Sequence, residues 1–254
     1  MKFNAKQETE RVVEFIRDYY RKNNLKGATL GISGGKDSAV VAALMVKALG
    51  KENLLGVWMP CHSKPEDRED AKLVSDYYGF ELIDYDLTNV YETFKSNLSS
   101  LGTFDETLTL NSDINIKPRL RMTTLYYLAA LYSAIKNGPY LVIGTSNKCE
   151  LHVGYFTKGG DSIHDLAVLA DFTVEEVIAI GEYLKVPAKV LYKTPDDGLS
   201  NKSDEDKLGV TYKQIAKRIN GEEVPEEVAT KIDALHRRNL HKFNIPTYRK
   251  SNEA

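Results

Sequence analysis

The chain has 254 residues, with 34 Lys and Arg against 36 Asp and Glu, so its formal net charge is −2. This balance excludes the polybasic surfaces typical of nucleic-acid-binding and anionic-membrane-binding proteins, and it favours a small polar substrate. The length suits one large α/β domain or two small ones. We expect a single domain over residues 1–254, with a helical tail from about residue 225.

The two cysteines and the N-terminal segment indicate the cellular compartment. Cys61 and Cys149 lack CxxC spacing, so we expect free thiols rather than a disulfide or a zinc site. The N-terminal segment carries charges throughout, and no stretch reaches 18 apolar residues. We therefore expect neither export nor a membrane span, and a cytoplasmic location.

Helical and strand patterns alternate along the first 150 residues or so. Apolar residues at helical spacing predict an amphipathic helix over residues 5–23. Short apolar runs predict strands at 28–32, 54–59, 80–85 and 140–144, and helices between them at 39–49, 68–78 and 119–136. This alternation predicts an α/β fold with a Rossmann-like parallel sheet and helices on both faces.

Polar segments follow the first and the fourth predicted strand, SGGKDS at 33–38 and GTSNKCE at 144–150. Ligands of parallel sheets bind at the carboxyl ends of the strands, near the point where strand order reverses. We therefore expect these two strands to be neighbours and their polar ends to share one site.

The pattern becomes irregular after residue 150. Two polar segments without periodicity, 154–171 and 194–209, are expected to be functional loops. Between them Thr173-Val-Glu-Glu176 is typical of a capping box that opens a helix to Leu184, and a last helix is predicted over 226–243.

The stretch GISGGKDS, residues 31–38, predicts a phosphate-binding loop that differs from the Walker type. A Walker loop needs four residues between its first glycine and Gly-Lys-Ser/Thr, whereas Gly31 and Gly35 enclose three, and Asp37 follows Lys36 where a hydroxyl should stand. The remaining features are free backbone N–H groups, two serines, a helix N-terminus and one carboxylate, which suits magnesium beside phosphates. The alternative, a plain glycine turn, needs neither the aspartate nor the serines.

The string Ser-Gly-Gly-x-Asp-Ser is similar to the signature of the N-type ATP pyrophosphatases, adenine-nucleotide α-hydrolase-like enzymes that cut ATP between its α- and β-phosphates. Further matches are NIKPRLRM at 115–122, GTSNKCELHVGYFTKGGD at 144–161, KSDEDKLG at 202–209 and the closing His241-Lys242. Over about residues 10–245 the chain resembles the ammonia-dependent NAD synthetases. The resemblance implies that deamido-NAD, ATP and ammonia give NAD, AMP and pyrophosphate through an acyl adenylate, that Mg²⁺ is the cofactor, and that the enzyme is a homodimer. No glutaminase segment is recognisable, so free ammonia is the expected nitrogen source.

The resemblance also implies roles for single residues. The implied catalytic residues are Asp37, Glu150 and Asp161, the first two as magnesium ligands. The implied ATP-binding residues are Gly31, Ser33, Gly34, Gly35, Ser38, Ser63, Thr145, Lys158 and Asp196, with Asp70 also near the adenine. The implied deamido-NAD-binding residues are Asn115, Arg119, Tyr155, Phe156, Asp161, His241 and Lys242.

Plain structural roles stay open for several of these residues. Glu150 would be a solvated helix residue, Ser63 a helix cap, and Arg119 part of a charged helix face. Tyr155 and Phe156 would be core aromatics. Cys149 lacks a partner base, and packing is its expected role.

Two positions depart from the pattern of the family that the chain resembles. Val174 stands where many relatives have a lysine facing phosphate, and Lys148, Lys158 or Lys193 are the candidates to supply that charge. Asp196 replaces a small hydroxyl residue. Despite these changes we expect the protein to cleave ATP, but the identity of the acyl acceptor stays open. The alternatives are another ligase of the superfamily acting on a different carboxylate, and a non-catalytic adenine-nucleotide sensor.

Overall fold

The computed structural model describes residues 3–102, 104–194 and 203–249. Within these residues a parallel sheet has the strand order β3-β2-β1-β4-β5. The strands are β1 (Gly27–Gly31), β2 (Leu54–Trp58), β3 (Glu81–Asp84), β4 (Tyr140–Gly144) and β5 (Leu166–Ala167). The predicted adjacency of the first and the fourth strand is confirmed. Strand order reverses between them, and this is where parallel sheets open a ligand crevice.

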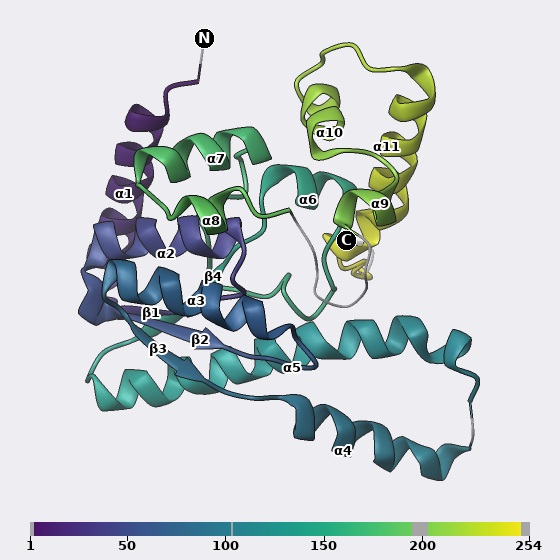
Figure 1. Ribbon diagram of the computed structural model, residues 1–254, viewed down its shortest axis with the longest axis horizontal. Coiled ribbons are helices and arrows are strands. Elements are labelled where there is room, and N and C mark those ends of the chain that lie inside the picture. The colour runs from purple at the N-terminus through teal and green to yellow at the C-terminus, as the bar shows by residue number, and fades with distance from the viewer. Residues whose placement is uncertain (1–2, 103, 195–202, 250–254) are drawn as a thin grey trace, which may run out of the picture.

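Helices cover both faces of this sheet, which confirms the predicted α/β class (Figure 1). One face carries α2 (Lys36–Leu49) and α3 (Pro65–Tyr78), with α1 (Ala5–Lys22), α7 (Val174–Tyr183) and α8 (Ala188–Leu191) packed outside them. The other face carries α5 (Glu106–Ile135), beside which α4 (Thr88–Leu98) runs. Short 3₁₀ turns span Lys51–Asn53, Ser99–Leu101 and Leu240–Lys242.

Helix α2 is apolar on all sides because it lies between two layers. Every residue from Ala39 to Met45 is buried, under the sheet on one side and under α1, α7 and α8 on the other. A helix without a polar face requires such double coverage. The coverage fixes the N-terminus of α2, and with it the glycine turn, at the end of β1.

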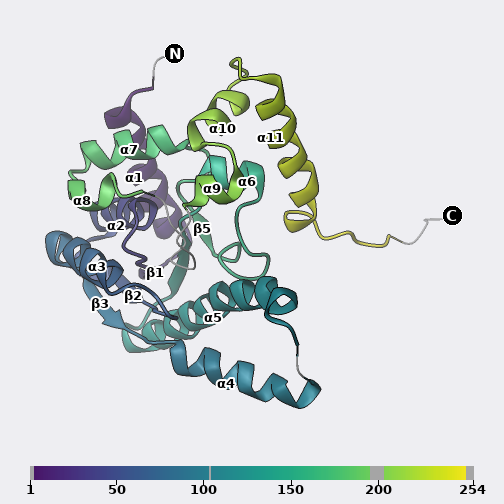
Figure 2. The same cartoon turned by 45° about the vertical axis from the view of Figure 1, so that its right-hand side comes forward.

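A second apolar cluster lies beside the sheet. It joins α6 (Lys148–Val153), α9 (Asp204–Leu208), α10 (Tyr212–Ile219) and α11 (Glu226–Asn239). Figure 2 shows α10 and α11 next to α6. Ile178 of α7 packs against both this cluster and the main core, so the C-terminal helices are tied to the sheet.

The structure corrects two predicted boundaries. Helix α5 begins at Glu106, well before the predicted residue 119, and runs through Pro118, where a helix break is the ordinary expectation. The prediction that 194–209 is irregular was wrong for Asp204–Leu208, where Ser203 caps a short helix by accepting from the Asp206 backbone N–H. In the described part of the chain, no helix combines the length and the apolar character needed to cross a bilayer.

Candidate active site

A cavity of about 890 Å³ opens at the carboxyl ends of β1, β2 and β4. Its volume is within the range of small-molecule sites. Most of the predicted site residues lie on its wall: Gly31, Ser33, Gly34, Gly35, Asp37, Ser38, Ser63, Asn115, Thr145, Glu150, Tyr155, Phe156, Asp161 and Lys242.

The turn between β1 and α2 is braced by its own hydroxyl groups. Ser38 Oγ donates to the Gly35 carbonyl at 3.0 Å and accepts from the Ser33 N–H at 3.3 Å, while the Gly35 N–H donates to Ser33 Oγ at 3.3 Å. Gly35 is the N-cap of α2, so the unpaired first-turn N–H groups of the helix lie at the cavity wall. A helix N-terminus beside glycines is a site for phosphate.

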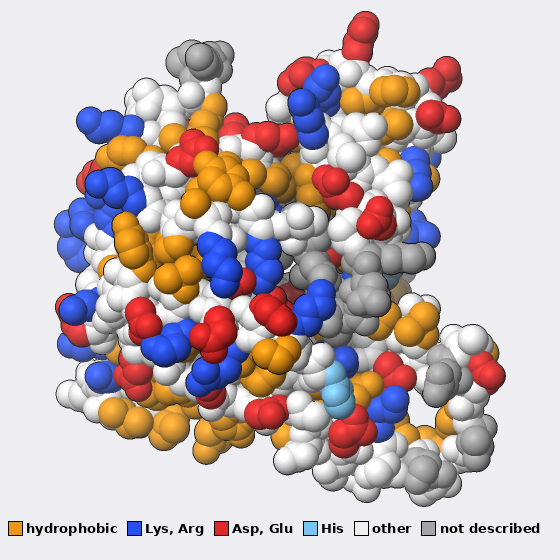
Figure 3. Space-filling view, in the orientation of Figure 1, with side chains coloured by type: hydrophobic (Ala, Val, Ile, Leu, Met, Phe, Trp, Pro, Cys, Tyr) orange, Lys and Arg blue, Asp and Glu red, His pale blue; other side chains and the backbone are white. Residues whose placement is uncertain are grey.

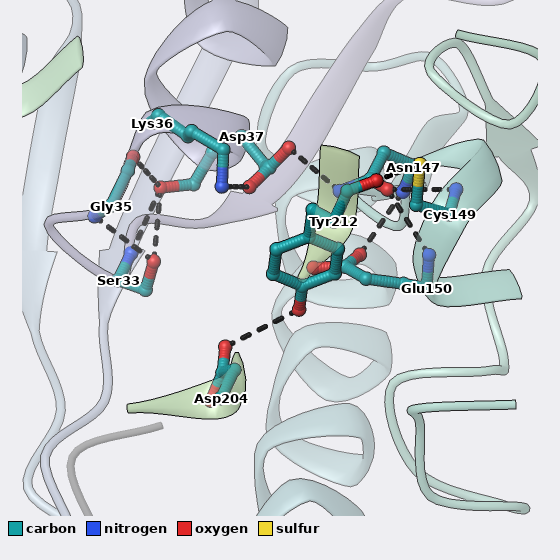
Figure 4. Close-up of polar contacts among 10 residues, drawn as sticks. Ser33, Gly35, Lys36, Asp37, Asn147, Cys149, Glu150, Asp204 and Tyr212 are labelled. Carbon is teal, nitrogen blue, oxygen red and sulfur yellow. Dashed lines mark hydrogen bonds and ion pairs between the residues drawn. The ribbon is translucent and has the colours of Figure 1, made fainter. Parts of the chain in front are cut away.

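Asn147 joins the two predicted metal ligands (Figure 4). Its side-chain Nδ2 donates to Asp37 Oδ1 at 3.2 Å, and its backbone N–H donates to Glu150 Oε2 at 3.1 Å. Its Oδ1 accepts from the backbone N–H groups of Cys149 and Glu150, which caps α6. The acids at the tips of two adjacent strands are therefore held together by one residue, and Glu150 lies on the cavity wall rather than on a solvated helix face.

Asp37 and Glu150 are close enough for their charges to repel, and the ammonium of Lys36 lies beside them. Burial, and next the charge of Asp37, raise the pKa of Glu150 well above its usual range, while Lys36 opposes the rise. Lys36 Nζ lies 2.9 Å from Asp37 Oδ2. Burial alone would lower the pKa of Lys36, but Asp37 and Glu150 raise it above its ordinary value, so the ammonium stays charged.

The donor set fits magnesium. Asp37 and Glu150 offer hard carboxylate oxygens at the cavity wall, and the described residues contain no group of three or more His, Cys, Asp or Glu arranged to hold a metal. Magnesium usually takes one or two protein carboxylates and fills its remaining positions with water and substrate phosphates. A pair of acids beside a phosphate-binding turn fits the coordination preferences of magnesium better than those of zinc or calcium.

Asp161 occupies another part of the wall. Its Oδ1 accepts from the Thr157 N–H at 2.9 Å, and the Thr157 hydroxyl donates to Asn115 Oδ1 at 2.8 Å. Desolvation by the surrounding cavity wall raises the pKa of Asp161 above its ordinary value, although the Thr157 N–H and the charges of Lys242 and Arg121 oppose the rise. Asp161 is exposed toward the cavity, and a carboxyl group with a perturbed pKa on such a wall suits a role with an amine.

Some predicted residues lie off the wall. Arg119 is exposed and donates to the Lys158 carbonyl at 3.3 Å and 3.2 Å, and Lys158 Nζ in turn donates to the His241 carbonyl at 2.7 Å. None of these three lines the cavity, whereas Arg121 does. Asp196 falls outside the described residues.

The lysine that Val174 replaces has one candidate substitute on the wall. Val174 is buried in the second apolar cluster. Lys148 does not line the cavity, and its Nζ pairs with Asp171 Oδ1 at a distance of 2.9 Å. Lys193 lines the cavity, with its Nζ 2.6 Å from Asp67 Oδ1. Of the three lysines considered, Lys193 is the one placed to face a ligand.

Several polar residues at or beside the cavity were not predicted as site residues, among them Asn147, Asp204 and Tyr212. Asn147 had a local signal, because Asn with Glu three residues later is typical of a helix start. Asp204 lies in the segment 202–209 that matches the family but was given no role there, and Tyr212 had no local signal. The buried Asp204 carboxylate accepts from the Tyr155 hydroxyl at 2.9 Å and the Tyr212 hydroxyl at 3.5 Å. Only the packing of α9 and α10 against α6 brings them to the site.

Both cysteines are free and buried, as predicted. Burial raises the pKa of the Cys149 thiol to about 11, so the thiol is protonated at neutral pH. Its Sγ contacts the Tyr212 carbonyl at 3.8 Å, inside the second apolar cluster. This is a packing role and leaves no thiolate for nucleophilic chemistry.

Comparison with known proteins decides the family. The family model described as NAD synthase matches residues 8–246. The chain belongs to the NAD synthase family. Curated members that it resembles include the NH(3)-dependent NAD(+) synthetase of Carboxydothermus hydrogenoformans, 41% identical over 248 residues that cover 97% of this chain and 98% of the relative.

Solved structures of an NMN synthetase and an NAD synthetase share the fold of this chain. The NMN synthetase of Francisella tularensis superposes with a TM-score of 0.87 at 30% identity, covering 98% of this chain and all of the other. The NH3-dependent NAD synthetase of Campylobacter jejuni, in complex with the nitrate ion, gives 0.78 at 27% identity, again covering 98% and 100%. The predicted family and fold class are thereby confirmed.

Proposed function

We propose that this NAD synthase family protein joins ammonia to deamido-NAD at the expense of ATP, giving NAD, AMP and pyrophosphate. One observation carries the proposal: Asp37 and Glu150, tied together by Asn147, face a cavity beside a phosphate-binding turn. The family and the names of the relatives support this reaction over other uses of such a site.

The reaction must bring two anions together. The substrate carboxylate attacks the α-phosphorus of ATP, pyrophosphate leaves, and ammonia then displaces AMP from the acyl adenylate with loss of one proton. In this proposal the turn N–H groups and the hydroxyls of Ser33 and Ser38 hold the phosphates, and Asp37 and Glu150 hold Mg²⁺. The bound ion would supply the positive charge that offsets the two anions.

The amine step is assigned to Asp161. Its place on the cavity wall and the upward direction of its pKa shift support a carboxyl group that binds the incoming ammonium and accepts its proton. Ser63 and Thr145 are assigned to ATP, and Asn115, Tyr155, Phe156 and Lys242 to the dinucleotide. Roles for Arg119, Lys158, Asp196 and His241 in binding stay predictions.

We also propose a homodimer formed through α5. Figure 3 shows hydrophobic side chains gathered along the lower edge of the molecule, where α5 runs in Figure 1. Tyr127, Leu131 and Ile135 of α5 are exposed at intervals of four residues, which places them on one face of the helix. Such a stripe on a water-facing helix supports an interface with a second copy. The cytoplasmic location and the single-domain organisation stay predictions.

A second candidate substrate is nicotinate mononucleotide, the acid from which the same chemistry would make NMN. The NMN synthetase of Francisella tularensis superposes with a TM-score of 0.87, against 0.78 for the NAD synthetase of Campylobacter jejuni. Val174, in place of the lysine common in relatives, adds a difference in sequence, although its side chain is buried in the second apolar cluster. Both acids carry the same pyridinium carboxylate and differ in the presence of the adenylyl half.

The decisive experiment offers the purified protein Mg²⁺-ATP, ammonium and either acid, and measures amide, AMP and pyrophosphate. We expect NAD in equal amount to AMP, and none without ammonium. A kcat/KM that is higher for the mononucleotide would favour the second candidate. AMP formed only with an unrelated carboxylate would indicate a different ligase, and nucleotide binding without AMP would indicate a sensor.

A further inference from the structure

Lys36 occupies an unusual place for a lysine. It is the first residue of α2, and its side chain is 5% exposed. Figure 4 shows its ammonium directed at Asp37, with a separation of 2.9 Å. On another side the ammonium lies 5.7 Å from the centre of the Tyr212 ring, a cation–π contact made by a buried aromatic residue of α10. A lysine without a function normally reaches solvent.

Three helices contribute carboxylates to the cavity that Lys36 lines, and one of them, Asp37, is in direct contact with the ammonium. Asp37 comes from α2, Glu150 from α6 and Asp204 from α9, and the charge of each acts on Lys36. All three acids line the same cavity as Lys36. Carboxylates gathered in a poorly solvated site repel one another unless a cation lies between them. In the ligand-free protein Lys36 supplies such a positive charge, in direct contact with Asp37.

We propose that Lys36 is the resident cation of the magnesium site: its ammonium compensates the carboxylates until nucleotide and metal arrive, and it then exchanges Asp37 for phosphate oxygens at the adjacent turn. The inference rests on the proposed function for the identity of the metal site. The exchange makes metal binding depend on nucleotide, because a free divalent ion must displace the ammonium from its ion pair with Asp37. A triphosphate supplies the alternative anion.

The first test removes the ammonium. Lys36→Gln keeps a side chain of similar length but no charge, and we expect it to bind Mn²⁺ in the absence of nucleotide about tenfold more tightly than the wild type, or more. Isothermal calorimetry with Mn²⁺ alone measures this. Lys47→Gln is the matched control, since Lys47 lies in the last turn of the same helix and pairs with Glu10 on the surface. Equal Mn²⁺ affinity of Lys36→Gln and the wild type overturns the proposal.

The second test uses the wild-type protein, so it does not depend on the variant folding. Crystals grown with Mn²⁺ and α,β-methylene-ATP should show the anomalous signal of Mn²⁺ at Asp37 and Glu150, with Lys36 Nζ more than about 4 Å from Asp37, beyond ion-pair distance. Manganese bound there while Lys36 keeps its contact with Asp37 contradicts the exchange, as does manganese bound elsewhere.

Neither test requires amide synthesis. A protein that passes both but makes no NAD or NMN would overturn the proposed function and leave the exchange standing. A protein that makes NAD but fails both tests would support the proposed function and overturn the exchange.

Discussion

Gly34 adopts a backbone conformation that most residues avoid, with φ of 81°. A Cβ atom at this position would lie 2.5 Å from the Asp67 carbonyl oxygen, so the turn also needs the missing side chain for space. Gly221 has nearly the same φ, 74°, yet a Cβ there would meet nothing within 4 Å. A side chain added at Gly221 would cause backbone strain alone, whereas one added at Gly34 would cause backbone strain and a steric clash with Asp67.

We therefore predict different outcomes for two identical substitutions. Gly221→Ala should cost only the left-handed strain, about 1 kcal/mol of unfolding free energy, and leave ATP binding unchanged. Gly34→Ala should add a clash with α3 that displaces the turn, and it should weaken ATP binding by about tenfold or more, or 1.4 kcal/mol. Calorimetric titration with ATP and urea unfolding measure both quantities. An unchanged ATP affinity in Gly34→Ala would show that the turn does not hold the nucleotide.

The charge of Asp37 is the second feature at this scale. Asp37→Asn keeps the shape and an oxygen able to accept from Asn147, but removes the charge that would hold magnesium. We predict that the rate of AMP formation falls about 100-fold or more, since charge stabilisation carries most of phosphoryl-transfer catalysis. A pyrophosphate-release assay checks this, with Asp18→Asn on the surface of α1 as control. Full activity in Asp37→Asn would remove the magnesium assignment.

At the scale of elements, α3 and α8 are clamped by a buried carboxylate. Asp70 is 2% exposed and receives Lys189 Nζ and Lys193 Nζ, each at 2.6 Å. Asp70 was expected near the adenine, but it does not line the cavity, because its oxygens face these lysines. Burial alone would raise its pKa, yet the bonds from Lys189 and Lys193 lower it below the ordinary 3.8.

The clamp predicts a pH-dependent contribution to stability. Asp70→Asn should lower the unfolding free energy by about 2 kcal/mol at neutral pH, less than for a fully buried ion pair because Lys189 is largely exposed. A carboxyl group with a depressed pKa stabilises the fold above its unfolded pKa and loses that effect as the pH falls through its folded pKa. The difference in unfolding free energy between the wild type and Asp70→Asn should thus become smaller below about pH 4.

Urea unfolding across this pH range is the measurement. Asp76→Asn is the control, because Asp76 lies on the same helix in an exposed pair with Lys72, and it should change stability by about 0.5 kcal/mol or less. A difference between wild type and Asp70→Asn that stays constant down to about pH 3 would contradict the clamp.

Sequence reasoning found most of the local elements and few of the long-range contacts. The strand, glycine turn and helix around residues 31–38 were predictable because each depends on neighbouring residues. Helix α5 was predicted too short, because Pro118 reads as a break and only tertiary packing shows that the helix continues. Asp204 and the Lys193 contacts join residues more than a hundred positions apart to the site, which periodicity cannot reveal.

At the scale of the whole molecule, the exposed stripe of α5 predicts the oligomeric state. The double variant Tyr127→Glu with Leu131→Glu places two charges in the proposed interface and should halve the mass measured by light scattering after gel filtration. Leu73→Glu with Tyr77→Glu is the matched control, since both residues are exposed on α3 with the same spacing. A monomeric wild type, or a dimeric α5 double variant, would contradict the proposed interface.

Helix α6 has six residues, too few to persist in water without support. Its support at the N-terminal end is Asn147, the same residue that positions Asp37. When this turn frays, Asn147 therefore releases both Asp37 and Glu150 from their positions in the site. The exchange of the Cys149 and Glu150 amide protons with deuterated solvent reports how often the enzyme visits an inactive form, and bound nucleotide should slow that exchange.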